Sequence, residues 1–542
     1  MKNQRLWALM LTALMLAAML GGCTQPSGGP TGTPASTKPA DTNPAANPTD
    51  TPEPDPFAEP VHFTGSAVPY LSDGVDYGQD AVYEALSEKF NFTYQLYPLT
   101  WDNWAEKNRM WITSGEMPDF TMWNFNFTEY VNYAEQALIA PMPEGWDSAY
   151  PNLYAMVDAT GLREKVTLDG KISILPRATF KNFAPIQRAL SHQSLIYRDD
   201  YREQLGMDPI GDTITLEQLN EYLSGCTEQG LSRVGLSSNY AGIVQLFVSM
   251  HESGFNTFFV KDGQYVWGPA QPGTLEGIKL LKEQYDEGII DPDFYLNNSK
   301  EHREKFAAGM IPMMYDDGTV NNLDGRINEF IAANPGADGY NMIKMTTAVG
   351  PDGKWHGTES GNFWASTIFK PDIEEEVHNR ILALLDYVCT VEGQELVQLG
   401  IEGTDWERNA DGSYAILRPK NEDGTYPLLR NIYPSCALWY QFGVLVDDFS
   451  FVDPTRDTRV VDSVISMYKT REQNGNFLEF DPDYQFFVSD AKSVYSVDVA
   501  SEIVRIIMTD GVDIDAEWAK FIETQKPMWE PVLNDLNEAF GS

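Results

Sequence analysis

Residues 24–58 constrain the fold of this chain most, because nothing in them can form a hydrophobic core. They consist almost entirely of Thr, Pro, Ala, Asn, Asp, Gly and Ser, and proline recurs every few residues from Pro26 to Pro56. Such a segment cannot bury enough apolar surface to offset the entropy of folding, and its prolines keep it extended. The folded body therefore begins near residue 60, and the remaining stretch of about 480 residues is long enough for two lobes or more.

A short basic and apolar segment precedes this stretch and ends in a cysteine. Lys2 and Arg5 come first, an apolar run extends from Leu6 to Leu20, and two glycines then lead to Cys23. This order is that of a bacterial lipoprotein signal, and the run is short for a membrane span. We therefore predict a cleaved signal peptide over 1–22, lipidation of Cys23, and a disordered tether over 23–58 that holds the body at the outer face of the cell membrane. A retained N-terminal anchor helix is the alternative.

Charge and cysteine content exclude several classes of protein. The formal net charge is −41, so the surface repels nucleic acid and anionic lipid, and we expect membrane contact through the lipid anchor only. The remaining cysteines, Cys226, Cys389 and Cys436, are odd in number and have no C-x-x-C spacing, which argues against a disulfide framework. The six histidines show no metal-ligand spacing, and Asp291-Pro292-Asp293 is too short for a calcium loop. We expect no metal and no cofactor.

Strand-like and helix-like patterns alternate along the body. A strand from Val61, a helix over 80–90, a strand over 92–96 and a helix carrying Trp104 and Trp111 come first, and this order predicts an α/β domain with a largely parallel sheet. The seven-residue spacing of Trp104 and Trp111 favours core positions. Further strands are expected at 172–175, 195–198, 233–236 and 310–315. Further helices are expected after the capping box at Thr215 and over 372–399, where Gly400 ends the helix.

Six segments taken together resemble the extracellular solute-binding proteins (family 1) of ABC importers, in particular the large sugar-binding lipoproteins of Gram-positive bacteria. They include Ser114-Gly115-Glu116-Met117-Pro118-Asp119-Phe120 and Leu168-Asp169-Gly170-Lys171-Ile172, which continues to Pro176. The others are 196–206, 287–294, 306–310 and 390–403. Their order across residues 60–410 is more specific than any one of them, and the last hundred residues match only loosely.

The resemblance implies a two-lobe periplasmic-binding-protein-like fold of α/β class, with interleaved lobes, a hinge and a ligand cleft between the lobes. Chain crossings expected near residues 180, 303 and 346 assign 60–180 plus 303–345 to lobe 1 and 181–302 plus 346–542 to lobe 2. The resemblance also implies a monomer that captures a carbohydrate, expected to be an oligosaccharide, and delivers it to the permease subunits of an ABC transporter.

A carbohydrate binder needs aromatic platforms for C–H faces and planar polar groups for hydroxyls. The chain contains 13 Trp, most of which are expected in the core. Residues at expected strand ends or in loops are the candidates for ligand contacts, because ligands bind at the carboxyl edge of an open α/β sheet. They are Trp123, Asn124, Tyr240, Tyr315, Asp316, Asp317, Trp364, Trp406 and Trp439. For each Trp a core position, and for Asp316 and Asp317 a solvated turn, is the competing interpretation.

Enzyme signatures are missing from the sequence. His251-Glu252 lacks the second His of a zinc-protease helix, and neither a G-x-S-x-G elbow nor a P-loop is present. Paired carboxylates for glycoside hydrolysis remain open, because 79 Asp and Glu make chance pairs inevitable. We therefore expect a binding protein and not an enzyme. The alternatives are a secreted carbohydrate-active enzyme and a peptide-binding lipoprotein on the same scaffold.

Overall fold

The computed structural model describes residues 56–541 except 67–74, 101–102, 125, 182–183, 299, 423 and 443–448. The predicted signal peptide 1–22, Cys23 and the tether up to residue 55 lie outside the described residues.

A five-stranded mixed sheet forms the centre of the first lobe, in the order β2-β1-β3-β14-β6. Its strands are β1 (Val61–Gly65), β2 (Phe92–Leu96), β3 (Phe120–Trp123), β14 (Ser366–Phe369) and β6 (Leu175–Pro176). The first three strands are parallel, as predicted, whereas β14 runs antiparallel to both β3 and β6. The sheet is therefore only partly parallel, because β14 enters it from a distant part of the chain.

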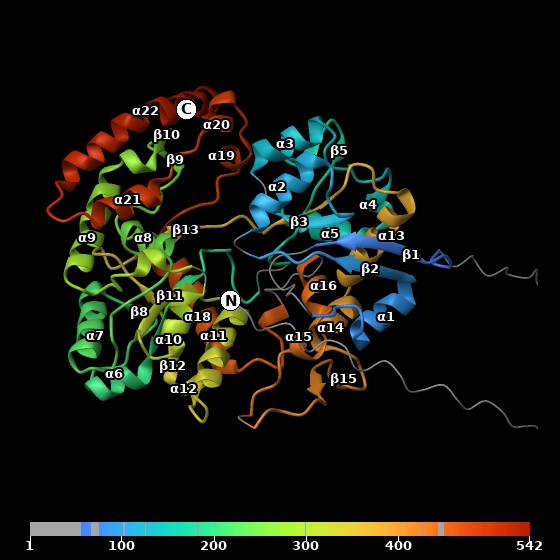
Figure 1. Ribbon diagram of the computed structural model, residues 1–542, viewed down its shortest axis with the longest axis horizontal. Coiled ribbons are helices and arrows are strands. Elements are labelled where there is room, and N and C mark those ends of the chain that lie inside the picture. The colour runs from blue at the N-terminus through green and yellow to red at the C-terminus, as the bar shows by residue number, and fades with distance from the viewer. Residues whose placement is uncertain are drawn as a thin grey trace, which may run out of the picture. The chain divides into compact units, whose positions relative to one another are not determined.

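Helices from both halves of the chain surround this sheet (Figure 1). They are α1 (Ala81–Phe90), α2 (Trp104–Ser114), α3 (Phe127–Glu135), α4 (Trp146–Ala149), α5 (Pro151–Ala159), α13 (Glu375–Val388), α14 (Val391–Leu399), α15 (Leu429–Ile432) and α16 (Cys436–Phe442). The α1 helix follows its sequence pattern: the Asp80 side chain caps it, and Val82, Leu86 and Phe90 are buried on one face. Two hairpins complete the lobe, β4–β5 (Thr167–Leu168, Lys171–Ile172) and β15–β16 (Trp406–Arg408, Tyr414–Ile416).

A four-stranded sheet forms the centre of the second lobe, in the order β11-β7-β12-β8. Its strands are β11 (Met313–Asp317), β7 (Gln193–Arg198), β12 (Ile343–Ala348) and β8 (Thr213–Ile214). Its helices are α6 (Asp199–Leu205), α7 (Leu216–Glu228), α8 (Tyr240–Ser249), α9 (Pro272–Asp286), α10 (Glu301–Ala307), α11 (Val320–Ala333), α12 (Gly339–Met342), α18 (Thr458–Asn474) and α21 (Val499–Ile507). The capping box at Thr215 is present at the start of α7, as its sequence predicts.

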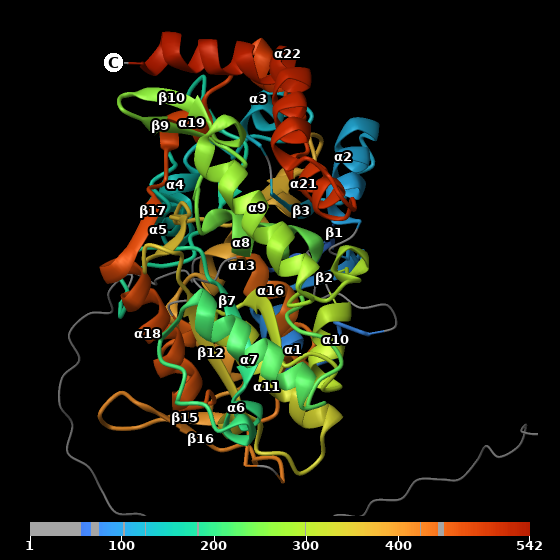
Figure 2. The same cartoon turned by 90° about the vertical axis from the view of Figure 1, so that its left-hand side faces the viewer.

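Most of the described residues after α16 pack on this second lobe, whereas Phe449 and Phe486 pack on Trp406 and Phe127 of the first lobe. Strand β17 (Gly475–Leu478) pairs with β13 (Trp355–Thr358), and two short helices follow, α19 (Pro482–Phe486) and α20 (Asp490–Val494). The long helix α22 (Ile514–Phe540) contacts α9 and the hairpin of β9 (Phe258–Lys261) and β10 (Gln264–Trp267), as Figure 2 shows. Trp529 of α22 stacks on Trp267 with 5.0 Å between ring centroids, so this helix completes the core of the lobe.

Three sequence-based expectations about these elements are wrong. Segment 303–345 does not join the first lobe, because β11 and β12 both pair with β7 of the second sheet. The chain instead returns to the first lobe just before β14, at Trp364, and leaves it again after α16, so that the described parts of the first lobe lie within 56–178 and 364–442. Residues 233–236 form only an isolated bridge, from Leu236 to Ile290. The helix expected over 372–399 is two helices, because the Thr390 side chain caps a new helix at Gly393 N.

Candidate functional site

The carboxyl edge of the first sheet brings together residues that are far apart in sequence. Strand β3 ends at Trp123, which lies opposite Ser366, the first residue of β14, and Ser366 in turn pairs with Pro176. Asn124 and Trp364 therefore lie at this edge, beside Arg177. The Trp364 amide donates to the Arg177 carbonyl at 3.0 Å, and the Arg177 guanidinium lies 5.0 Å from the Trp364 ring centroid. Asn124 is exposed and Trp364 is half-buried.

One side chain fixes the loop that carries Trp364. Asn362 accepts hydrogen bonds from Thr179 Oγ1 at 3.0 Å and from Phe180 N at 2.9 Å, and its amide donates to the carbonyls of Phe180 at 2.7 Å and Ala159 at 2.9 Å. All four contacts join the segment before β14 to the segments after α5 and β6. The Trp364 ring is thus held on a rigid support, as a stacking platform requires.

Trp123 packs inward from the same edge. Only 2% of it is exposed, and its ring lies 5.8 Å from Trp104 and 5.2 Å from the Arg109 guanidinium. Its Nε1 and the hydroxyl of its register partner Ser366 are buried and have no hydrogen-bond partner among the described residues. A contact between Trp123 and a ligand stays a prediction, and in this conformation it would require the ring to become exposed.

The second sheet presents a corresponding edge. Strand β11 ends at Asp317, which lies opposite Gln193, the first residue of β7. Ser237 bridges to Met314, and the Ser238 hydroxyl donates to the Tyr315 carbonyl at 2.7 Å. The next two residues are Asn239, which caps α8, and Tyr240, which is 39% exposed. The loop before α8 therefore places Tyr240 on the same side of the molecule as the carboxyl end of β11.

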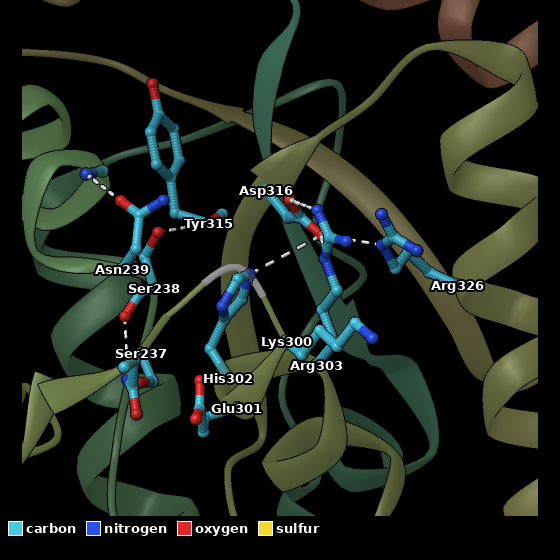
Figure 3. A network of polar contacts seen from close by, with 12 residues as sticks. Ser237, Ser238, Asn239, Lys300, Glu301, His302, Arg303, Tyr315, Asp316 and Arg326 are labelled. Carbon is cyan, nitrogen blue, oxygen red and sulfur yellow. Dashed lines mark hydrogen bonds and ion pairs between the residues drawn. The ribbon is translucent and has the colours of Figure 1, made fainter. Parts of the chain in front are cut away.

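Asp316 and Asp317 follow each other in β11 and point in opposite directions, since side chains alternate along a strand. The Asp316 carboxylate accepts from Arg303 at 2.7 and 3.0 Å and from Arg326 at 2.7 Å, with His302 at 3.7 Å (Figure 3). Burial alone would raise the pKa of Asp316, but His302 and the two arginines outweigh it and hold the pKa well below its usual range. This carboxylate is fully engaged within the protein.

Asp317 keeps part of its carboxylate accessible. Its side chain is 24% exposed, lies 3.2 Å from His192 Nε2, and accepts from Thr319 N at 2.9 Å. Burial raises its pKa, and His192 together with the Thr319 amide outweighs this effect, so that the pKa is lowered. An ionised and accessible carboxylate at a sheet edge can accept hydrogen bonds from ligand hydroxyls.

Tyr315 lies behind this edge, beside a buried arginine that no sequence motif marks. Both line a small pocket of about 10 Å³, room for about one water molecule. Burial raises the pKa of Tyr315 to about 12, which Arg471 opposes, so the phenol stays a donor. Arg471, on α18, donates to the carbonyls of Ser191 and Gln193, the latter at 2.8 Å, and to the Ser194 hydroxyl at 2.8 Å. It thereby fixes the segment that enters β7 from the first lobe.

Trp406 and Trp439 are core residues in this structure. Trp406 is 3% exposed, and its Nε1 donates to the Gly400 carbonyl at 3.0 Å. Trp439 is fully buried, with ring centroids 5.9 Å from Phe92 and 6.5 Å from Phe120. Their faces are occupied by protein, so ligand contacts from either residue stay predictions that this packing does not favour.

The described part of the chain contains neither a metal-type cluster of side chains nor a helix suited to span a membrane. Within it, no three His, Cys, Asp or Glu side chains are grouped as they would be around a metal ion. Nor does any helix there combine the length and the apolar character needed to cross a membrane.

Comparison with known proteins identifies the fold. No protein-family model matches the chain. Lipoprotein LipO of Bacillus subtilis (strain 168) is 24% identical over 254 residues, which are 44% of this chain and 49% of LipO, so that the match spans about half of the relative's length.

Solved structures match over a larger share of the chain. The alginate-binding protein AlgQ2, without calcium ion, superposes with a TM-score of 0.63 at 14% identity, covering 90% of this chain and 99% of its own. The Streptococcus pneumoniae ABC-transporter substrate-binding protein FusA, in complex with kestose, gives 0.63 at 14%, covering 88% and 98%. The N-glycan transport solute-binding protein NgtS of S. pneumoniae, in complex with Man1GlcNAc, gives 0.57 at 16%, covering 89% and 98%. The chain has the α/β fold of solute-binding proteins, and this prediction is confirmed.

Proposed function

We propose that this chain is a lipid-anchored substrate-binding protein of an ABC transporter, which captures an oligosaccharide and delivers it to membrane permease subunits. One observation carries the proposal: the polar and aromatic edges of the two sheets, at Trp364 and Asp317, belong to a fold shared with binding proteins that were solved with kestose and Man1GlcNAc. The chain acts as a monomer in this proposal and performs no chemistry on its ligand.

The two edges supply complementary contacts for a sugar. On the first lobe, the Trp364 ring offers a flat face for C–H groups, with the buried Arg177 guanidinium beside it, and the exposed Asn124 offers a planar polar group. On the second lobe, Asp317 accepts from hydroxyls and the exposed Tyr240 offers a second ring. A ligand that contacts both edges gains from lobe closure, since hinge motion brings the two sets of contacts together.

Binding without turnover fits the carboxylates at the second edge. A glycoside hydrolase needs two carboxyl groups on either side of the scissile bond, one of them protonated at working pH. In β11, Asp316 is held ionised by Arg303 and Arg326 and faces away from the edge. Asp316 therefore cannot serve as the second carboxyl group of a catalytic pair with Asp317. The carbohydrate-active enzyme is therefore the less favoured alternative.

In this proposal, a lipid at Cys23 and the tether that follows it attach the protein to the membrane. The name of the B. subtilis relative describes a lipoprotein, which supports this part of the proposal. A lipid at Cys23 keeps the loaded protein close to its permease, so that delivery takes place at a high effective concentration. Permease partners and the extracytoplasmic location follow from the same arrangement.

A glycan panel tests the proposal. The mature full chain is titrated with neutral and acidic oligosaccharides in a thermal-shift assay, because a ligand that binds only the native state raises the melting temperature. Hits are confirmed by calorimetry, and the same mixtures are analysed for cleaved glycan. Binding without cleavage supports the proposal, whereas turnover of a bound glycan would favour the enzyme. Tight binding of peptides together with no response to any glycan would identify the peptide-binding alternative.

A further inference from the structure

A polar cavity of about 250 Å³ lies away from the sheet edges described above. The first lobe contributes Gln398, at the end of α14, and Arg418, which follows β16. The second lobe contributes Asp324 of α11 and Tyr340 of α12. The segment 453–459, which leads into α18, completes the lining. Its volume is below the roughly 300 Å³ at which pockets for drug-sized ligands begin, so a single small molecule fits it and an oligosaccharide does not.

The position of Tyr340 shows that the cavity is separate from the carboxyl edge of the second sheet. Tyr340 lies in α12, the helix that directly precedes β12, and the first residue of β12, Ile343, pairs with Arg198 at the end of β7. Asp317, in contrast, pairs with Gln193 at the start of β7. Tyr340 and Asp317 therefore lie toward opposite ends of the same strand.

The carboxylates that line the cavity already have donors within the protein. Asp324 accepts from Arg456 at 2.6 Å and from the Tyr340 phenol at 2.8 Å. Asp453 accepts from Thr455 and lies 3.2 Å from Arg456 Nε. Asp457 is paired with Arg459 at 2.7 Å, and Asp338 accepts from Asn341 Nδ2 at 2.6 Å. These acidic groups therefore offer little to a ligand that donates hydrogen bonds.

The donors on the first-lobe side remain open. Arg418 is 7% exposed and donates from its Nη1 to the Leu399 carbonyl at 2.8 Å, but its Nε has no acceptor among the described residues. The Gln398 Nε2 is likewise buried without an acceptor in the described part of the chain. Lys420 is exposed and lies over the Tyr426 ring at 4.7 Å. Burial lowers the pKa of Arg418, because it outweighs the attraction of Asp405 and Asp453.

A buried guanidinium with an unused N–H is costly unless an acceptor reaches it. We propose that this cavity binds a small organic anion, with its carboxylate or phosphate group held by Arg418, Gln398 and Lys420. Planar oxyanions suit the guanidinium fork, and an ion pair inside a cavity is stronger than one at the surface. This proposal is independent of the proposed oligosaccharide function, because the anion is titrated into the protein without any glycan.

Calorimetry with the full chain tests this site with three probes of similar size: gluconate, glucose 6-phosphate and neutral glucose. We expect heat of binding with at least one of the two anions and none with glucose, and the anion that binds shows whether the site takes a carboxylate or a phosphate. Arg418→Gln and Lys420→Ala should each weaken binding about tenfold or more, as for the loss of a charged contact. Lys171→Ala, an exposed lysine outside the cavity lining, serves as the matched control and should bind as wild type.

Lys420→Ala keeps the test decisive if Arg418→Gln fails to fold, because Lys420 is exposed and its loss leaves no buried group unpaired. The proposal is overturned if neither anion binds at a concentration of about 10 mM. A site that holds an anion by charged hydrogen bonds should have a dissociation constant well below that concentration. Equal binding of glucose, or unchanged anion affinity in Lys420→Ala, overturns it as well.

Discussion

Asp316 and Arg326 form a buried ion pair with 2.7 Å between the carboxylate Oδ2 and the guanidinium Nε, and each side chain is only 8% exposed. Arg303 donates to both oxygens of the same carboxylate, so one aspartate links β11 to both α10 and α11. The neighbouring Asp317 turns to His192 at the sheet edge. One strand thus holds one carboxylate in buried ion pairs and its neighbour at the accessible sheet edge.

Asp316→Asn should destabilise the protein by about 3–5 kcal/mol, because it leaves the buried Arg326 and the half-buried Arg303 without their charge partner. The wild-type contribution depends on pH: since the folded pKa of Asp316 is lowered, the stabilisation is complete above the unfolded value of about 3.9 and is lost as pH falls below it. Urea unfolding measures both effects. Asp317→Asn, at the more exposed neighbour, should cost less than about 1 kcal/mol. Similar losses in both variants would contradict this division.

Protonation of the buried His378 should cause a separate loss of stability in mild acid. Burial lowers its pKa to about 4, its ring centroid lies 4.3 Å from that of Phe369, and its Nε2 has no partner among the described residues. The unfolded chain takes up a proton near pH 6.5 and the native one near 4, so stability falls by about 3 kcal/mol as pH drops through that window.

His378→Phe should remove most of this pH dependence while it retains the ring packing. The measurement is the free energy of unfolding at pH 7, 5.5 and 4.5 for wild type and variant. The control is His62→Phe, which alters an exposed histidine of β1 and should leave the wild-type slope. An unchanged slope in His378→Phe would show that other groups cause the acid sensitivity.

Substitutions at two tryptophans should affect different properties, ligand affinity at Trp364 and folding stability at Trp439. Trp364→Ala should weaken oligosaccharide binding by about 30-fold, as expected for an aromatic residue central to an interface. Trp439→Ala removes a fully buried ring and should cost about 3–5 kcal/mol of unfolding free energy. Calorimetry with a glycan hit and denaturant unfolding give the two readouts. Retained affinity in Trp364→Ala would remove this residue from the site.

Cys23→Ala tests the anchor. Without the thiol no lipid can be attached, so the chain should move from the membrane fraction to the medium, while glycan affinity of the released body is unchanged. Immunoblots of fractionated cells follow the change, with Cys226→Ala as a control at another cysteine. Membrane retention of Cys23→Ala would instead indicate the uncleaved N-terminal helix.

Local signals in the sequence predicted several elements of both lobes. The apolar spacing of 80–90, the alternation of 92–96 and the capping box at Thr215 all depend on nearest neighbours, and the structure contains each of them. Lobe membership depends on distant partners instead. Strand β11 has the composition of any buried strand, and only its register with β7 assigns it to the second sheet. That register cannot be inferred from residues 310–317 alone.

The site residues show the same limit. The sequence placed Trp123 and Asp317 at strand ends and Trp364 in a loop, but it did not give the direction of each side chain. The candidates therefore included the inward Trp123 and the fully paired Asp316 beside accessible residues. Arg177 and Arg471 were missed because neither belongs to a motif. Each acquires its role from contacts across more than a hundred residues.

The place of β14 in the middle of the first sheet has a consequence for biosynthesis. Strand β3 is made early, but its neighbour on one side is β14, which follows the whole sheet of the second lobe in the chain. Because synthesis begins at the N-terminus, β3 has an unpaired edge until β14 has been made. Such an edge is prone to pair with other chains. A product that terminates before residue 366 would lack β14 and keep that edge unpaired permanently. Truncated products of this protein should therefore be prone to aggregate and depend on quality control during export.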